Sequence, residues 1–182
     1  MSLPRGTTQI TYCLRSDLHT EPRANNTVAV YKGAILYALE VTHERSSTPP
    51  KPYWNPDFGL EYYNKSYYPW QSHDWSYRNT SKWKYAIDPS TLVYHIDSPD
   101  PAPLPTPLFT SGGPPGHIAA MGCEIDWPMA FGRSVPGYPP VDRARRCVGD
   151  PVKVKLVPYA SAKTRMAELP VVNLRSDAQQ TV

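Results

Sequence analysis

Proline constrains the fold of this chain most, because 22 of its 182 residues are Pro and they are spread along the sequence. Proline has no backbone N–H, so it is excluded from the interior of an α-helix and from a central β-strand. Between the prolines, the strand-favouring residues Val, Ile, Tyr, Thr and Trp are plentiful. We therefore expect an all-β fold of short strands joined by fixed turns.

Alternating apolar and polar residues predict where the strands lie. Gly33 predicts a break that divides the second apolar stretch into two strands, or one kinked strand, with the second half covered on both faces. The segments Lys82–Ile87 and Thr91–Ile96 flank a DPS turn, so we predict that they form a hairpin. The predicted strand segments are Thr8–Leu14, Val28–Val41, Lys82–Ile87, Thr91–Ile96, His117–Trp127 with an interruption at Gly122, and Asp150–Val172. In the last segment Lys153 and Lys155 alternate with Val152, Val154 and Leu156, and a PYAS corner at Pro158–Ser161 precedes a second alternating run.

We count about eight strands, as in a jelly-roll-like sandwich of two antiparallel sheets. The length suits one domain spanning residues 1–182, with a core from about 8 to 172 and a polar tail over 173–182. Ser98–Pro107 and Ser134–Ala144 read as surface connectors rich in proline.

Charge and hydrophobicity exclude two classes of partner, nucleic acids and membranes. The net charge is +3, and the basic run DRARRC at Asp142–Cys147 is short and reads as a solvated loop. No basic stripe is interleaved with aromatic residues, so we expect no nucleic-acid partner. No apolar stretch reaches the roughly 20 residues of a membrane helix, so we expect no membrane partner.

Cysteines and sequons bear on the compartment. Cys13, Cys123 and Cys147 are an odd set, so at least one thiol is unpaired, and the sequence leaves open whether the other two pair. Their spacing does not suggest zinc, and we expect neither a metal nor another cofactor. The sequons at Asn25, Asn64 and Asn79 favour a secreted parent protein, although no secretory signal is visible at the start of the sequence.

The most unusual stretch is YWNPDFGLEYYNKSYYPWQSHDW, Tyr53–Trp75. Twelve of the 21 aromatic residues lie between Tyr53 and Tyr85. One interpretation is that these rings stack on sugars while carboxylates bind hydroxyl groups. The interpretation we favour is that the rings fill the sandwich or dock onto another domain, with Trp75, Trp83 and Tyr85 structural. The candidate sugar-binding residues are Trp54, Asp57, Tyr62, Tyr67, Trp70 and Asp74.

Catalytic groups are harder to find. Glycoside hydrolysis needs two carboxylates held across a cleft, and nothing places Asp57, Glu61 or Asp74 in such a pair. Glu124 and Asp126 would share one face of a strand, but no partner is apparent. A cysteine–histidine dyad has no local signature such as G-x-S-x-G. We therefore expect no catalytic residue within this chain.

Three motifs occur in an order that resembles a known family: TVAVYKGAILYALE, DWSYRNTSKWKYAI and VKVKLVPYASAKTRMAELPVV. They are similar to the C-terminal β-sandwich region of the β-L-arabinofuranosidase-like glycoside hydrolases, formerly a domain of unknown function. Pro158, Tyr159, Arg165 and Pro170 fall in matching places, whereas Gly33-Ala34-Ile35 replaces the usual Gly-Pro-Leu. The resemblance spans about Thr27 to Val172 and implies that catalysis belongs to an upstream (α/α)6 barrel.

The expected function follows from that resemblance. We expect an excised, non-catalytic accessory domain that braces the missing upstream barrel of the same chain. The alternative is an independent carbohydrate-binding module that uses the Tyr53–Trp75 aromatics on a carbohydrate ligand. A third reading, a self-sufficient hydrolase, would require two carboxylates converging in a pocket.

Overall fold

A computed structural model describes residues 6–7, 9–12, 14–48, 54–55, 60–61, 73–97, 103–104, 106–110, 114–132 and 135–174. Within these residues the secondary structure consists of strands and short 3-10 turns, so the predicted all-β class is confirmed. The strands are β1 (Leu18–Arg23), β2 (Thr27–Lys32), β3 (Ile35–Leu39), β4 (His43–Thr48), β5 (Trp54–Asn55), β6 (Leu60–Glu61), β7 (Asp74–Asn79), β8 (Tyr85–Ile87), β9 (Val93–Ile96), β10 (Gly116–Glu124), β11 (Val152–Pro158) and β12 (Leu169–Pro170). The 3-10 turns are η1 (Ala24–Asn26), η4 (Pro89–Thr91), η5 (Ala130–Gly132), η6 (Asp142–Ala144) and η7 (Tyr159–Ser161).

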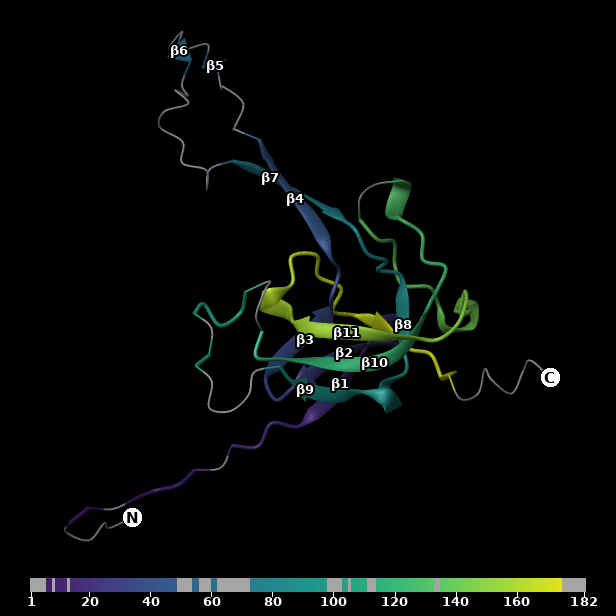
Figure 1. Ribbon diagram of the computed structural model, residues 1–182. Coiled ribbons are helices and arrows are strands. Elements are labelled where there is room, and N and C mark those ends of the chain that lie inside the picture. Colours follow the sequence, from purple (N-terminus) through teal and green to yellow (C-terminus); the bar gives the residue numbers. More distant parts are fainter. Residues whose placement is uncertain are drawn as a thin grey trace.

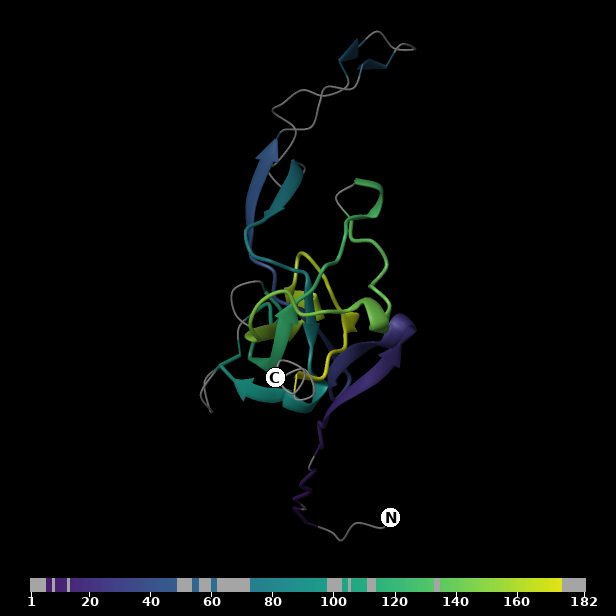
Figure 2. The same ribbon diagram turned by 90° about the vertical axis from the view of Figure 1, so that its right-hand side faces the viewer.

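Eight strands form one curled antiparallel sheet in the order β1-β2-β3-β11-β10-β8, with β12 beside β2 and β9 beside β10 (Figures 1 and 2). Residues 166–172, here called the closing segment, connect β2 to the edge strand β8 of this sheet. Leu169 and Pro170 pair with β2, and Val171 forms a parallel bridge to Ile87 of β8. The antiparallel, sandwich-like arrangement is confirmed, and its opposed layers belong to one sheet that curls back on itself.

The predicted break at Gly33 is confirmed, because it lies in the two-residue turn between β2 and β3. Gly33 has a φ of 58°, which a glycine adopts without steric cost at this position of a hairpin turn. Its N–H donates to the Asp17 carbonyl at 2.8 Å. Tyr37, Ala38 and Leu39 of β3 are all buried, as expected for a strand covered on both faces.

Strand β10 is central, and the interruption predicted at Gly122 is wrong. The strand runs through Gly122 to Glu124, and a Cβ at this position would lie 2.4 Å from the Ala86 carbonyl oxygen of β8. The glycine therefore permits close approach of two strands rather than ending one. The predicted hairpin of β8 and β9 is also wrong, since both strands pair with successive parts of β10.

Asp88 produces the arrangement in which β8 and β9 follow one another along β10. Its buried carboxylate accepts hydrogen bonds from the Ser90 N–H at 3.0 Å and the Ser90 hydroxyl at 2.7 Å, which caps η4. The turn moves the chain along β10 rather than back onto β8, because side-chain bonds of this kind offer the backbone an alternative to strand pairing.

The prediction for the first segment is wrong in position. Residues 9–12 and 14–17 are irregular, and the first strand is β1 at Leu18–Arg23. Six register pairs join β1 to β2. The described residues of the alternating segment Thr8–Leu14 pair with no described strand, whereas the LHTEPR segment lies directly across the η1 turn from β2. No described helix is long and apolar enough to cross a membrane.

The core fills the curled sheet. Val30, Ile87, Ile118, Leu156 and Leu169 are fully buried and belong to one cluster. Tyr37 and Tyr94 meet edge-on in this cluster with ring centroids 6.5 Å apart. Burial, followed by the neighbouring Tyr94, raises the pKa of the Tyr37 phenol well above its usual value. Trp83 and Tyr85, predicted as core residues, are half-buried and pack against the same cluster.

A second cluster surrounds Ile125 and Trp127 beyond the end of β10. Trp83 packs edge-on against Trp127, with ring centroids 5.4 Å apart. A disulfide between Cys123 and Cys147, which the sequence had left open, ties β10 to the loop before β11. Cys13 lies outside the described residues.

The basic run at Asp142–Cys147 is not simply a solvated loop, because Arg145 is buried. Its side chain is 1% exposed, and its guanidinium donates hydrogen bonds to backbone carbonyls from three separate segments. Burial lowers the pKa of Arg145, and the Asp142 carboxylate at 3.7 Å opposes this effect. The acceptors are the carbonyls of Pro140 at 2.8 Å, Asn26 at 2.7 Å, Val171 at 3.2 Å, and Asn25.

Candidate functional site

A two-stranded arm leaves the curled sheet and is formed by β4 and β7, which pair over their whole length (Figure 1). Apart from the half-buried His43 and Trp75, the residues of both strands are exposed. Strand β4 runs to Thr48 and β7 begins at Asp74, its register partner. The arm therefore presents both of its faces to solvent.

Side-chain pairs hold the arm together. The Arg45 guanidinium lies over the Trp75 ring at 4.5 Å, and His43 meets Tyr77 edge-on at 5.1 Å. Arg78 forms an exposed ion pair with Glu44 at 2.7 Å. Trp75, predicted to be structural, is thus an element of the arm rather than of the core.

The aromatic stretch, which holds most of the predicted sugar-binding residues, lies in the sequence between β4 and the start of β7. Asp57, Tyr62, Tyr67 and Trp70 lie outside the described residues. Trp54 begins β5, opposite Glu61 of β6, and its side chain is likewise not described. Asp74 is the one candidate with a described side chain: it is exposed and opposite Thr48. The structure therefore leaves the predicted sugar-binding group untested.

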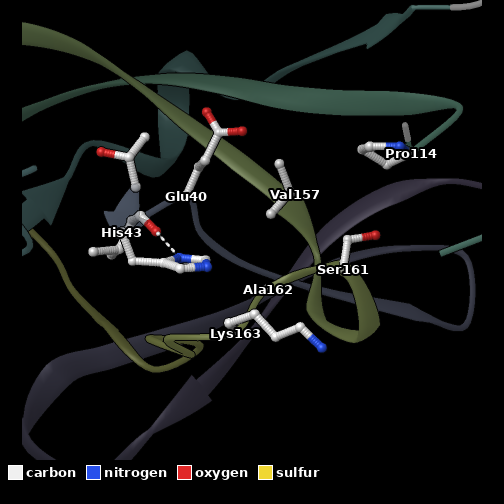
Figure 3. A pocket seen from close by; sticks show the side chains of 9 residues that line it. Glu40, His43, Pro114, Val157, Ser161, Ala162 and Lys163 are labelled. Carbon is white, nitrogen blue, oxygen red and sulfur yellow. Dashed lines mark hydrogen bonds between the residues drawn. The ribbon is translucent and has the colours of Figure 1, made fainter. Parts of the chain in front are cut away.

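A cavity of about 290 Å³ lies where the arm joins the sheet. Figure 3 shows Glu40 and His43 on one side of it, Ser161 and Pro114 on the other, and Lys163 below. The His43 Nδ1–H donates to the Val41 carbonyl at 3.4 Å, which fixes the ring beside the first residues of β4. The buried Ser161 hydroxyl has no hydrogen-bond partner among the described residues.

The base of the arm is anchored beside this cavity. Thr164 donates its hydroxyl proton to the Asn79 side-chain oxygen at 3.0 Å, and the Thr42 N–H donates to the Ser81 hydroxyl at 2.9 Å. The first bond connects the segment after η7 to the end of β7, and the second joins the residue before β4 to the chain just after β7. The arm leaves the sheet from a hydrogen-bonded base.

The charges in the cavity do not suit glycoside hydrolysis. Among the described residues that line it, Glu40 is the single carboxylate, and Lys155 neutralises it at 3.2 Å. A second carboxylate across the cavity would be needed for acid–base or nucleophilic cleavage. Sequence reasoning missed Glu40, His43, Ser161 and Lys163, because they are far apart in sequence and no motif connects them.

The other predicted reactive groups have structural partners. Glu124 forms an ion pair with Lys82 at 2.5 Å, and Asp126 is exposed beyond the end of β10. Cys123 and Cys147 are oxidised to the disulfide and so neither is a thiolate nucleophile.

A second projection is the loop at residues 127–132 and 135–138, here called the Phe131 loop. Two hydrogen bonds connect its sides: the Trp127 indole N–H donates to the Gly137 carbonyl at 2.9 Å, and the Ala130 N–H donates to the Val135 carbonyl at 2.9 Å. Phe131 has a φ of 51° and is 95% exposed. A left-handed conformation is uncommon for a non-glycine residue and persists where the surrounding structure imposes it.

Both views show that the Phe131 loop and the arm project from the same end of the curled sheet (Figures 1 and 2). Tyr138, at the base of the Phe131 loop, is 92% exposed, and Met129 and Val135 are also exposed. We call the arm and the Phe131 loop together the fork. The Phe131 loop side of the fork offers exposed aromatic and apolar side chains, and the arm adds the exposed ring of Tyr77.

Comparison of this chain with protein-family models, with curated proteins and with solved structures finds no match. The family resemblance of the three sequence motifs therefore stays a prediction. The geometry of the fork and of the cavity at its base carries the functional argument.

Proposed function

We propose that this chain is a non-catalytic accessory β-domain of a glycoside hydrolase, and that it braces a helical catalytic barrel through the fork. The observation that carries this proposal is the projection of the arm and the Phe131 loop from one end of the fold. Two projections from one end of a domain surround part of a neighbouring domain, which a flat surface does not do.

Energetics supports a neighbour on the fork. An isolated two-stranded hairpin is at best marginally stable in water, and the arm is supported by its base and by its own cross-strand pairs. The Phe131 loop carries the exposed apolar side chains of Met129, Phe131, Val135 and Tyr138, and clustered apolar surface on a soluble protein commonly marks an interaction site. Phe131 and Tyr138 add aromatic rings, the residue type enriched at the core of interfaces.

The residues that carry the family resemblance have architectural contacts here. The Arg165 guanidinium lies over the Tyr159 ring at 4.7 Å and donates from Nε to the Ala162 carbonyl at 2.9 Å. Pro158 ends β11, and Pro170 is a fully buried member of the closing segment. Such roles agree with a domain whose motifs specify shape rather than chemistry.

An oxidising compartment fits the same proposal. Disulfides persist in secreted and extracellular proteins and are rare in the reducing cytosol, and the chain contains the Cys123–Cys147 bridge. The sequon residues Asn25 and Asn79 are both exposed. We therefore place the proposed parent enzyme outside the cell.

The isolated chain is expected to cleave no glycoside. The test is to incubate it with arabinofuranosides and a broad panel of chromogenic glycosides and to compare release with a protein-free blank. Turnover that disappears in Glu40→Gln would contradict the proposal, because it would make the cavity at the base of the arm an active site. A glycan array covers the alternative function: tight binding lost in Trp54→Ala or Trp70→Ala would favour a carbohydrate-binding module.

Docking through the fork gives the second expected result. The natural transcript is expected to encode a helical domain upstream, and the two separately expressed parts are expected to associate. Phe131→Ser and Tyr138→Ser should each weaken that association by roughly 1–2 kcal/mol or more, as for central interface aromatics. Isothermal titration calorimetry measures the effect. Tyr12→Ser is the matched control, since Tyr12 is equally exposed but lies on the N-terminal segment.

A transcript without a helical domain, or association unaffected by Phe131→Ser and Tyr138→Ser, would contradict docking through the fork. The glycoside panel and the docking experiment are independent. The first tests the absence of catalysis, and the second tests the bracing role.

A further inference from the structure

Two histidines lie side by side on the outer face of the sheet, away from the fork. His95 of β9 and His117 of β10 are direct register partners, and their rings stack with centroids 5.0 Å apart and planes inclined by 18°. Their neighbours Tyr94 and Ile118 pack into the core, so the alternation of a strand places both imidazoles on the opposite face. Both rings remain partly exposed.

Asp97 orients one of these rings. The His117 Nδ1 lies 2.7 Å from Oδ1 and 2.8 Å from Oδ2 of the Asp97 carboxylate. The Asp97 backbone N–H in turn donates to the Pro115 carbonyl at 3.0 Å, which fixes the carboxylate at the end of β9. In the tautomer that donates from Nδ1 to Asp97, the Nε2 lone pair of His117 is free to bind another group.

We propose that His95 and His117 together bind a divalent transition-metal ion, such as Zn²⁺ or Cu²⁺, with Asp97 as the positioning residue. Imidazole nitrogen suits these ions, and a histidine ligand almost always donates its other N–H to a carboxylate, carbonyl or water. The His117–Asp97 pair already has this arrangement. Cross-strand partners supply the second imidazole at a fixed separation on the same face.

The required movement is small. Imidazole–metal bonds of about 2.0–2.1 Å place two ligand nitrogens about 3 Å apart in a chelate, so the rings must tilt toward each other from their stacked position. Rotation about the side-chain torsions of these partly exposed histidines does not disturb the strand pairing. The backbone is therefore already in place for the ion.

The site is expected to hold its ion exchangeably. No group of three or more His, Cys, Asp or Glu side chains suited to a metal is found among the residues that the structure describes. Two imidazoles leave the remaining coordination positions to water or to a ligand from another molecule. This differs from closed structural zinc sites, which use four protein ligands. The inference does not depend on the proposed accessory role.

The test titrates the untagged chain with Zn²⁺ and separately with Cu²⁺ in a neutral, non-chelating buffer, followed by calorimetry. One ion per chain is expected. Asp97→Asn should weaken binding by about 10–100-fold, the usual effect of losing a carboxylate that orients a ligand. His95→Gln and His117→Gln should each weaken it at least as much. The Cu²⁺ complex should show nitrogen coupling from two imidazoles in its electron paramagnetic resonance spectrum.

His19→Gln is the matched control, because His19 is also an outer-face histidine that stacks on a ring, that of Tyr31 at 5.4 Å. It should leave the affinity unchanged. His95→Gln removes no hydrogen bond in the described part of the chain, so it keeps the test valid if another variant fails to fold. Absence of binding, or an affinity unchanged in His95→Gln, would overturn the metal site, and an unchanged affinity in Asp97→Asn would overturn the role of Asp97.

Discussion

Replacing Arg145 by methionine is expected to lower the free energy of unfolding by about 3–5 kcal/mol, the usual cost of breaking a buried charged contact from one side. Methionine keeps much of the volume of the side chain but donates no hydrogen bond. The guanidinium joins the η1 turn, the loop before η6 and the closing segment, so its removal leaves buried carbonyls without a donor. Urea denaturation, followed by tryptophan fluorescence, measures the change.

Two further variants make this result specific. Arg146→Met is the control, because Arg146 is exposed and carries the same charge in the next position; its effect should stay within about 0.5 kcal/mol. Arg145→Lys should destabilise as well, since an ammonium cannot reach acceptors in several directions as a planar guanidinium does. Equal stability of Arg145→Met and Arg146→Met would show that the buried contacts contribute nothing to folding.

Removing the Cys123–Cys147 disulfide is expected to have the second-largest effect. The bridge spans a sequence separation of 24 residues, for which the loss of loop closure corresponds to about 3–4 kcal/mol. The double variant Cys123→Ala, Cys147→Ala should therefore unfold at much lower urea concentration. The closed loop contains Trp127 and the Phe131 loop, so the variant should also lose protection from amide exchange there before the curled sheet does.

Chemical reduction of the unaltered protein should reproduce the effect of the double variant. Cys13→Ala is the control, because Cys13 takes no part in this disulfide. If the reduced and oxidised proteins unfold at the same urea concentration, the hydrogen bonds of Trp127 and the contacts of Arg145 are enough to hold the loop. That outcome would contradict the predicted contribution of the disulfide.

The sequence predicted the elements whose signals are local. Proline content and strand-forming residues indicated the all-β class, Gly33 marked the β2–β3 turn, and the alternation of Lys153 and Lys155 with Val154 and Leu156 placed β11. The errors have non-local causes. Strand β1 has no stronger pattern than the irregular segment before it, and only its pairing with β2 selects it. The consecutive arrangement of β8 and β9 depends on the cap from Asp88 and on the length of β10.

The candidate site was less predictable than the fold. The sequence analysis selected the aromatic stretch, whose side chains lie largely outside the described residues. It read the Arg145 run as solvated, because composition does not reveal which of several adjacent arginines faces inward. No local sequence pattern marks Phe131, since its exposure and its left-handed backbone follow from the hydrogen bonds around it. His95 and His117 meet only through strand register.

The closing segment has a consequence for biosynthesis. Its residues, which include β12, leave the ribosome after all other strands of the curled sheet, yet they join β2 to β8. Until they emerge, the nascent polypeptide exposes unpaired strand margins of the kind that invite pairing between molecules. Maturation of this chain thus waits for its last strand, and premature termination before Leu169 would be far more harmful than loss of the irregular residues that precede β1.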